Sequence, residues 1–264
     1  MTLRIATWNI NSVRLRIETV RRFVEQAGID VLCLQETKAH NDVFPFDALR
    51  ELGFPHIHAQ GMKSYNGTAI LSRLPFTPGD ARQWCDKDDC RHSIAVLPDG
   101  TEIHNFYVPA GGDIPDPAVN VKFAHKLRFL DEMQSWFAAR SKPENRMVLV
   151  GDLNIAPLET DVWSHKALLK VVSHTPVEVE RLAKVQSSHH WVDAVRHVIA
   201  PDKLLFTWWS YRAQDWDAAD KGRRLDHVWV TPPLQTDIAG AEVIRAARGW
   251  TLPSDHVPVV VTLS

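Results

Sequence analysis

The sequence predicts an α/β protein built as a mixed sandwich of β-sheets, and three observations support this fold class. The chain opens with the pattern of a strand, a helix and a second strand. Polar residues follow the first apolar strands but precede the last two, which indicates strands that run in opposite directions. Between residues 36 and 147 the apolar stretches are short and separated by turn signals, as in antiparallel hairpins. A regularly alternating parallel barrel would lack the last two features.

The first elements follow from hydrophobic periodicity. Residues 3–7 alternate in the manner of a strand that ends at the polar residues around Asn9. Ser12 is expected to cap a helix over residues 13–27, where apolar side chains recur at spacings of three and four. Gly28 is expected to end this helix, because glycine readily adopts the left-handed conformation found after a last turn.

The later elements are a second long helix and several buried strands. The continuously apolar run at 30–34 predicts a strand that is covered on both faces. A helix is expected from Asp116 to about Arg140, since Asp116 can cap it and a proline follows in the first turn. Further strands are predicted at Met147–Val150, Val228–Val230 and Val257–Leu263. Turns are predicted at Tyr65-Asn66-Gly67, Leu74-Pro75 and Pro98-Asp99-Gly100.

Composition places the chain among ordinary globular proteins. Its 264 residues include 30 Lys+Arg and 32 Asp+Glu, a net charge of −2, and 45% are hydrophobic, which excludes disordered and fibrous classes. We expect one domain over residues 1–264, because no linker rich in Pro, Gly or Ser interrupts the chain. Without a long apolar run or a signal peptide, we expect a cytoplasmic monomer that binds no membrane. Any nucleic-acid site must then be a local basic patch.

The three cysteines do not indicate a disulfide framework. Cys33 lies in an apolar run, where a reduced thiol serves as a small core residue. Cys85, Cys90 and His92 resemble part of a zinc loop but lack a fourth ligand. We therefore expect the segment from Cys85 to His92 to be a surface loop.

Polar side chains are expected to meet at one rim of the sandwich. If the last two strands run antiparallel to the strands before Asn9, Glu36 and Asp152, the ends of both sets lie on one side of the core. Oxygen ligands of this kind suit Mg²⁺ or Mn²⁺. Asp255-His256 and Asp226 can also supply a histidine oriented by a carboxylate. The oxygen-bearing candidates are Asn9, Glu36, Asp152, Asn154, Asp226 and Asp255. The alternative is that each acid only caps a turn at a strand end.

These residues lie in motifs that occur in a family order. The motifs are Thr7-Trp8-Asn9-Ile10-Asn11, Leu34-Gln35-Glu36-Thr37-Lys38, Tyr65-Asn66-Gly67, Tyr107-Val108-Pro109, Gly151-Asp152-Leu153-Asn154, Phe206-Thr207-Trp208-Trp209, Arg224-Leu225-Asp226 and Ser254-Asp255-His256-Val257-Pro258. Over nearly the whole chain the sequence resembles the exonuclease III / apurinic-apyrimidinic endonuclease family. The resemblance implies a DNase I-like fold, a four-layer α/β sandwich with two packed mixed β-sheets flanked by helices.

The resemblance also implies a role for each motif residue. A Mg²⁺ ion, replaceable by Mn²⁺, is expected at Asn9, Glu36, Asp152, Asn154, Asp255 and His256. Catalysis is expected from Tyr107, Asp152, Asn154, Asp226 and His256. In this scheme Asp152 activates water, Tyr107 and Asn154 hold the phosphate, and Asp226 orients His256 against the phosphoryl oxygens.

A second set is implied to contact DNA, and it contains departures from the family pattern. The expected DNA contacts are Arg14, Lys38, Lys63, Tyr65, Asn66, Trp208, Arg223 and Leu225. Among these, Trp208 and Leu225 match positions that shape the pocket for a flipped-out abasic sugar. Arg223 stands where relatives often have an apolar or aromatic residue, and Ala110 and Ser210 also depart from the pattern.

The resemblance therefore predicts a Mg²⁺-dependent DNA repair nuclease. Its partner is expected to be double-stranded DNA with abasic sites or blocked 3′ ends, cleaved 5′ of the abasic site or trimmed by 3′→5′ exonuclease and 3′-phosphatase reactions. One alternative is a related phosphodiesterase that acts on RNA or a phospholipid headgroup. Another is a non-catalytic DNA-damage binder, which would not require the complete acidic set.

Overall fold

The computed structural model describes residues 2–80 and 82–264 and contains two six-stranded mixed sheets. The first sheet contains, in spatial order, β13 (Ile238–Val243), β14 (Val259–Leu263), β1 (Leu3–Asn9), β2 (Val31–Gln35), β4 (Tyr65–Ser72) and β3 (His56–Met62). The second contains β5 (Thr77–Pro78), β6 (His92–Val96), β7 (Glu102–Tyr107), β8 (Met147–Asp152), β12 (Asp226–Val230) and β9 (Val192–Asp193). A separate two-stranded ribbon pairs β10 (Trp208–Trp209) with β11 (Gly222–Arg223).

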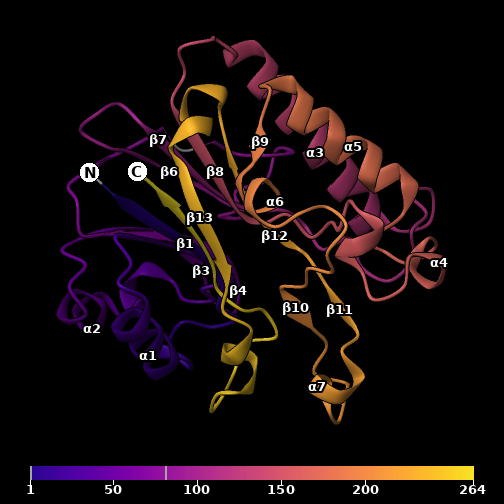
Figure 1. Ribbon diagram of the computed structural model, residues 1–264, viewed down its shortest axis with the longest axis horizontal. Helices are drawn as coiled ribbons and strands as arrows, with labels where there is room; N and C mark the ends of the chain where they lie inside the picture. Colours follow the sequence, from indigo (N-terminus) through magenta and orange to yellow (C-terminus); the bar gives the residue numbers. More distant parts are fainter. Residues whose placement is uncertain (1, 81) are drawn as a thin grey trace.

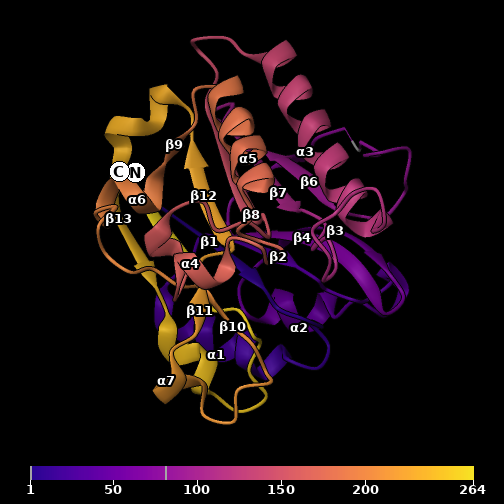
Figure 2. The ribbon, with the colours of Figure 1, turned by 90° about the vertical axis from the view of Figure 1, so that its right-hand side faces the viewer.

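The helices lie on both sides of the pair of sheets and in the loops that connect strands. They are α1 (Ile17–Ala27), α2 (Phe46–Glu51), α3 (Val121–Arg140), α4 (His165–Leu168), α5 (Pro176–Ser188), α6 (Ala194–Val198) and α7 (Trp216–Ala219). Short 3₁₀ helices span Asn41–Val43, Glu159–Asp161, Pro232–Asp237 and Arg245–Gly249. Figures 1 and 2 show α1 and α2 on one side of the molecule, α3 and α5 on the other, and the sheets between them. The predicted four-layer sandwich is confirmed.

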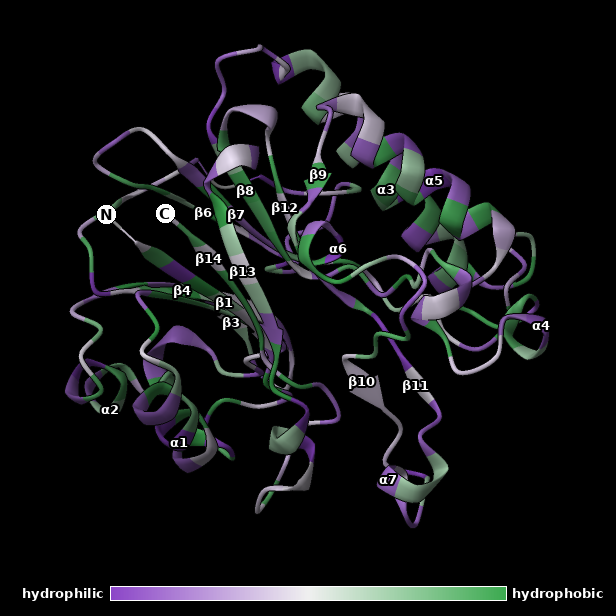
Figure 3. Ribbon diagram, in the orientation of Figure 1, coloured by the Kyte–Doolittle hydropathy of each residue, from purple (hydrophilic) through white to green (hydrophobic). Residues whose placement is uncertain are grey.

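Three apolar clusters hold these layers together. Between the sheets, aliphatic side chains of both inner faces meet, including Ile5, Val148 and Val261. The first sheet packs on α1 through residues such as Phe23, and the second packs on α3 through residues such as Phe137. Figure 3 shows β8 hydrophobic along most of its length, whereas α3 and α5 mix hydrophobic and hydrophilic residues. Buried strands and amphipathic covering helices are what a layered α/β fold requires.

Strand directions agree with the sequence prediction. β1 runs parallel to β2 and antiparallel to β14, while β8 runs parallel to β7 and antiparallel to β12. The ends of β1, β7 and β8 therefore lie on the same rim as the beginnings of β12 and β14. In this register Asp226 stands directly opposite Asp152, and Tyr107 is the parallel partner of Asp152.

The structure corrects the predicted start of the first helix. Ser12 does not cap it, because α1 begins only at Ile17. Instead, the backbone N–H of Ser12 donates to the Glu36 carbonyl and that of Val13 donates to the Thr37 carbonyl. Residues before the helix are thus held by the loop that follows β2. Gly28 ends the helix in the left-handed conformation, as predicted.

The second helix also starts later than predicted. Asn120 caps α3 by accepting from the backbone N–H of Lys122, and the helix begins at Val121. The Asp116 side chain accepts from the Ala118 N–H, so it caps a separate turn ahead of the helix. Strand limits shift by a few residues: β2 extends to Gln35, β8 extends to Asp152, β12 begins at Asp226 and β14 begins at Val259.

The hairpin predictions are partly confirmed. Strands β3 and β4 form an antiparallel hairpin, but it turns at residues 63–64, and Tyr65-Asn66-Gly67 begins β4. The Pro98-Asp99-Gly100 turn joins the antiparallel strands β6 and β7, as predicted.

The segment from Cys85 to His92 is not the surface loop that the sequence predicted. Cys85 and His92 are buried, and Asp89 is buried in an ion pair with Arg91. Trp84, just before it, packs on Phe129 of α3 with ring centroids 5.2 Å apart. Only residues 86–88 are exposed. All three cysteines are free, as expected, and Cys33 lies in the core.

Among the described residues, no helix has the length and apolarity needed to cross a bilayer.

Candidate active site

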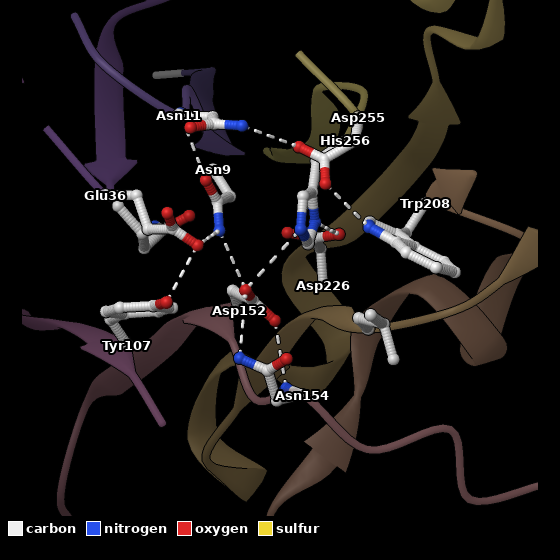
Figure 4. Close-up of polar contacts among 12 residues, drawn as sticks. Asn9, Asn11, Glu36, Tyr107, Asp152, Asn154, Trp208, Asp226, Asp255 and His256 are labelled. Carbon is white, nitrogen blue, oxygen red and sulfur yellow. Dashed lines mark hydrogen bonds and ion pairs between the residues drawn. The ribbon is translucent and has the colours of Figure 1, made fainter. Parts of the chain in front are cut away.

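Strand ends bring the predicted catalytic side chains to one point. Asn9 ends β1, Tyr107 ends β7 and Asp152 ends β8, whereas Asp226 begins β12. His256 lies just before β14 and forms an isolated bridge with Trp208 of the ribbon. Figure 4 shows these side chains turned toward one another from both sheets.

The backbone around this point contains several non-glycine residues with positive φ. Asn11, Glu36, Lys38 and Asn154, which follow β1, β2 and β8, have φ of 46°, 49°, 51° and 55°. Such residues are uncommon and tend to occur at functional sites, where the surrounding structure supports the strain. Gly151 has φ of 143°, and a Cβ there would lie 1.9 Å from the Phe106 carbonyl oxygen, so the residue before Asp152 must be glycine.

Asn9 links the carboxylates of the two sheets. Its Nδ2 donates to Glu36 Oε1 at 3.0 Å and to Asp152 Oδ2 at 2.9 Å. The Tyr107 hydroxyl donates to Glu36 Oε1 at 2.7 Å, and Lys38 Nζ lies 2.9 Å from Glu36 Oε2. Burial raises the pKa of Glu36, but the charge of Lys38 and the hydrogen bonds from Asn9, Lys38 and Tyr107 outweigh burial and lower the pKa. Glu36 is therefore a carboxylate at neutral pH.

Asp152 lies at the centre of the network. Its Oδ1 accepts from the Asn154 backbone N–H at 2.9 Å, and its Oδ2 accepts from Asn154 Nδ2 at 3.1 Å. Burial raises the pKa of Asp152 well above its usual range, although the nearby His256 opposes this effect. A carboxylate with a raised pKa is suited to accept a proton from water.

His256 is held between two carboxylates. Its Nδ1 lies 2.8 Å from Asp226 Oδ2, and its Nε2 lies 3.7 Å from Asp152 Oδ2. Burial lowers the pKa of His256, but the charges of Asp226 and Asp152 outweigh burial and raise it. The imidazole is therefore a cation that can stabilise negative charge at its Nε2 side.

Thr207 and Asn11 are partners that residue-by-residue sequence reasoning missed. The Thr207 hydroxyl donates to Asp226 Oδ2 at 2.6 Å and accepts from the backbone N–H of Asp226 at 3.1 Å. Asn11 Nδ2 donates to Asp255 Oδ1 at 3.2 Å. Both residues lie inside motifs named in the sequence analysis, and this position in a motif was the sequence feature that could have indicated a role in the site.

The donor set fits a hard divalent cation. Among the described residues, one ligand atom from each of Asp152, Asp226 and His256 lies within 4.8 Å of the others. Asp226 Oδ1 is buried and has no hydrogen-bond partner in the described chain. Asn9 turns its amide nitrogen toward the carboxylates and its oxygen toward the Asn11 N–H, so it acts here as a donor rather than as a ligand. Buried carboxylate oxygens are the preferred ligands of Mg²⁺ and Mn²⁺.

A cavity of about 570 Å³ opens beside this network. Its apolar lining includes Trp163, Trp208 and Leu225. Trp208 Nε1 donates to Asp255 Oδ2 at 3.0 Å, which connects the cavity wall to the acidic cluster.

The three departures from the family pattern, Ala110, Ser210 and Arg223, all line this cavity. Arg212 and Lys221 line it as well, and no sequence motif had indicated them.

The predicted DNA contacts are more widely distributed. Arg14, Lys63 and Tyr65 are exposed, and Lys38 is half-buried beside Glu36. Asn66 is buried instead, and its Nδ2 donates to the Asp89 carbonyl, so it supports the hairpin from inside. The structure thus gathers the acidic and imidazole groups, but it does not place all the basic and polar candidates on the surface.

Comparison with known proteins finds similarity over nearly the whole chain. Residues 6–256 match the profile of the Endonuclease/Exonuclease/phosphatase family. Exodeoxyribonuclease III of Haemophilus influenzae is 26% identical over 270 residues, covering 97% of this chain and 98% of that protein. An AP endonuclease from Archaeoglobus fulgidus superposes with a TM-score of 0.90 at 30% identity and 99% coverage of both chains. The 3′ phosphatase NExo from Neisseria, solved with a product DNA hairpin, gives a TM-score of 0.89 at 28% identity and 99% coverage of both chains.

Proposed function

Since the chain belongs to the endonuclease/exonuclease/phosphatase family, and within it to the exonuclease III and AP endonuclease group, we propose that it hydrolyses phosphodiesters of damaged duplex DNA. It is a DNA repair nuclease that cleaves 5′ of abasic sites and removes blocked 3′ ends. The observation that carries this proposal is the connected set of Glu36, Asn9, Asp152, His256 and Asp226 on one rim. A non-catalytic damage binder would have no use for the complete set.

The geometry supports the following roles. Asp152, with its raised pKa, aligns a water molecule and accepts its proton as the oxygen attacks phosphorus. Cationic His256, fixed by Asp226, and the Tyr107 hydroxyl neutralise the non-bridging oxygens of the phosphate. Burial raises the pKa of Tyr107, so this hydroxyl remains a donor. The P–O3′ bond then breaks and leaves a 3′-hydroxyl and a 5′-phosphate.

A divalent cation would complete the charge balance of this site. Glu36 and Asp255 would hold it, together with the carboxylate oxygens of Asp152. When bound, such an ion neutralises phosphate charge and stabilises a leaving oxygen. We infer Mg²⁺, because carboxylate oxygens dominate the donor set. The monomer, the single domain over residues 1–264 and the cytoplasmic location expected from the sequence form part of the same proposal.

The decisive experiment uses one end-labelled duplex with a single abasic site. We expect cleavage 5′ of that site in Mg²⁺, with a 3′-hydroxyl on the upstream product, and no cleavage in chelator. Glu36→Ala should be inactive at ordinary Mg²⁺ and partly rescued by excess Mn²⁺, because the remaining oxygens still hold a cation weakly. Binding without cleavage in any divalent metal would make the protein a damage binder instead.

A further inference from the structure

The cavity beside the active site has an acidic side and a cationic wall, which consists of Arg212, Lys221 and Arg223. Outside the catalytic acids, Asp113 is the single acidic residue among the described lining residues. No member of the cationic wall forms an ion pair within the described chain, so their charges are available to a ligand. An abasic deoxyribose has no charge of its own. The cationic wall therefore supplies positive charge that a neutral sugar does not require.

Arg223 is the member of the cationic wall that is held in place. Its guanidinium lies over the Trp208 ring, 5.2 Å from the ring centroid. Its Nη1 donates to the Ser173 hydroxyl at 2.8 Å and to the Val172 carbonyl at 3.0 Å. Its Nη2 has no hydrogen-bond partner in the described residues, which leaves a donor for a ligand in the cavity. Burial lowers the pKa of Arg223, but a protein arginine remains charged at neutral pH.

The support behind Arg223 is itself rigid. Ser173 has a left-handed φ of 88°, which is strained for a serine. The buried Glu178 carboxylate accepts from the Ser173 backbone N–H at 3.0 Å with both oxygens and so fixes that conformation. The acceptors of Arg223 Nη1 thus lie on a prearranged backbone, so little side-chain entropy of Arg223 remains to be lost on binding.

The position of Arg223 determines which groups the cavity can bind well. Trp208 connects it to the acidic cluster through the hydrogen bond to Asp255, so Arg223 lies one indole ring away from that cluster. A neutral sugar at this place would displace water from the guanidinium without offering a negative charge to pair with it, which is unfavourable. A second anionic oxygen would instead accept a charge-assisted hydrogen bond, which is among the stronger polar contacts.

Building on the proposed function, we propose that Arg223 makes the cavity selective for 3′-terminal phosphate esters with a second negative charge, at the expense of flipped abasic sugars. A 3′-phosphate meets this description through its terminal oxygen, and a 3′-phosphoglycolate meets it through its carboxylate. For the 3′-phosphate, water adds to phosphorus and the P–O3′ bond breaks, giving 3′-hydroxyl DNA and inorganic phosphate. The remaining negative charge stays on the phosphate that Arg223 faces.

The test compares kcat/KM on matched duplexes that differ only in the lesion: a 3′-phosphate at a gap, a 3′-phosphoglycolate at the same gap, or an internal abasic site. Arg223→Leu should lower kcat/KM on the 3′-phosphate by about ten- to a hundredfold, the usual effect of losing a hydrogen bond between charged groups. Abasic incision should become faster, because a neutral sugar would no longer have to displace water from the guanidinium. Arg223→Lys should fall between wild type and Arg223→Leu, because lysine keeps the charge but not the planar fork.

The 3′-phosphate and the 3′-phosphoglycolate distinguish two groups that could accept the hydrogen bond from Arg223. Loss on the 3′-phosphate alone would place the contact at the phosphate oxygens, and loss on the phosphoglycolate alone would place it at a carboxylate. Either outcome supports the proposal. An equal loss on all three duplexes would make Arg223 a general contact of the DNA backbone and would overturn the proposal. An unchanged ratio of kcat/KM on the anionic 3′ ends to kcat/KM on the abasic site would overturn it as well.

Arg140→Leu is the matched control. Arg140 also lies over an indole, 4.6 Å from the Trp136 centroid, but at the far end of α3 from the cavity. In Arg140→Leu, the ratio of kcat/KM on the 3′-phosphate to kcat/KM on the abasic site should therefore equal that of wild type. Ser173→Ala gives a second readout if Arg223→Leu is poorly folded by circular dichroism, because it removes one of the two acceptors of Nη1 and leaves the charge in place. It should reduce the preference for anionic ends less than Arg223→Leu does.

A binding measurement in chelator removes the chemical step. In the Asp152→Asn background, a gapped duplex with a 3′-phosphate should bind more tightly than the same duplex with a 3′-hydroxyl, and Arg223→Leu should abolish the difference. Equal affinities before that substitution would overturn the proposal. Failure of wild-type protein to cleave any of the three lesions in Mg²⁺ or Mn²⁺ would refute the proposed function, which is a separate result.

Discussion

At the scale of single residues, the site depends on atoms that serve two partners at once. Asn9 Nδ2 donates to both Glu36 and Asp152, and Asp226 Oδ2 accepts from both His256 and Thr207. The shared Asn9 nitrogen fixes the distance between two carboxylates that would otherwise repel each other. Replacing one member changes the charge state of the others, because each pKa depends on its neighbours.

Asp152→Asn separates binding from chemistry. The amide preserves the shape and the contact with Asn154, but it cannot accept a proton from water. We expect single-turnover cleavage to fall by about two to four orders of magnitude, while the dissociation constant for DNA in chelator changes little. Normal turnover of bound DNA together with a large loss of affinity would identify Asp152 as a binding residue.

The Asp226 and His256 pair is tested by a double-mutant cycle. Asp226 contacts His256 Nδ1 at 2.8 Å, and we expect the two residues to act on the phosphate as one unit. His256→Ala should abolish most activity and Asp226→Asn should cause a smaller loss of the same kind. The double variant should be little worse than His256→Ala, because residues that act as a unit are not additive. Losses that multiply would mean that the two residues act separately.

The sequence could predict the type and order of these residues, since motifs record them directly. It could not predict how Arg212 and Lys221 face the cavity, because both lie in irregular chain around α7 and its ribbon. Asn66 shows the same limit in reverse. Its motif position indicated a DNA contact, but its side chain is buried against the Asp89 carbonyl, a partner 23 residues away.

At the scale of elements, the helices on the second sheet also support the site. Lys126 of α3 is buried, and its Nζ forms an ion pair with Glu178 of α5. The same Nζ donates to the Asn154 carbonyl at 2.8 Å and to the Ala110 carbonyl at 3.3 Å. One ammonium group therefore ties both helices to the two loops that follow β7 and β8.

Breaking this pair should destabilise the fold measurably. Lys126→Met leaves Glu178 buried with an uncompensated charge, so we expect the free energy of unfolding to fall by about 3–5 kcal/mol. Urea denaturation followed by circular dichroism measures it. The double variant Lys126→Met/Glu178→Gln should lose less than the sum of the single variants, because it leaves no unpaired charge. Additive losses would show that the two side chains contribute independently.

Element boundaries were predicted less well than element types, for a physical reason. The apolar periodicity of α1 and α3 is local and was visible in the sequence. Their starts depend on distant partners, such as the carbonyls of Glu36 and Thr37 that bind the backbone before α1. Likewise, Cys85 is buried because Trp84 packs on α3, a contact that spans about 45 residues of chain and has no local signature.

At the scale of the whole molecule, the small net charge of −2 conceals an uneven distribution. The catalytic centre is acidic, whereas Arg14, Lys38 and Lys63 lie in the loops that leave β1, β2 and β3. Each phosphate that a lysine or arginine neutralises releases counterions, so such a protein should lose DNA affinity as salt rises.

The dependence of DNA affinity on salt measures how many of these residues act. We expect log K for duplex DNA in chelator to fall linearly with log salt over about 50 to 200 mM, and Lys63→Ala to reduce the slope by about 0.9, the value for one phosphate contact. Fluorescence anisotropy of a labelled duplex provides the measurement, and Arg140→Leu provides a remote control with an unchanged slope. Lys63 is exposed at the turn between β3 and β4, so its loss should leave the fold intact. A slope that Lys63→Ala leaves unchanged would place the DNA backbone away from this hairpin, and the basic path would then have to run through the cationic wall instead.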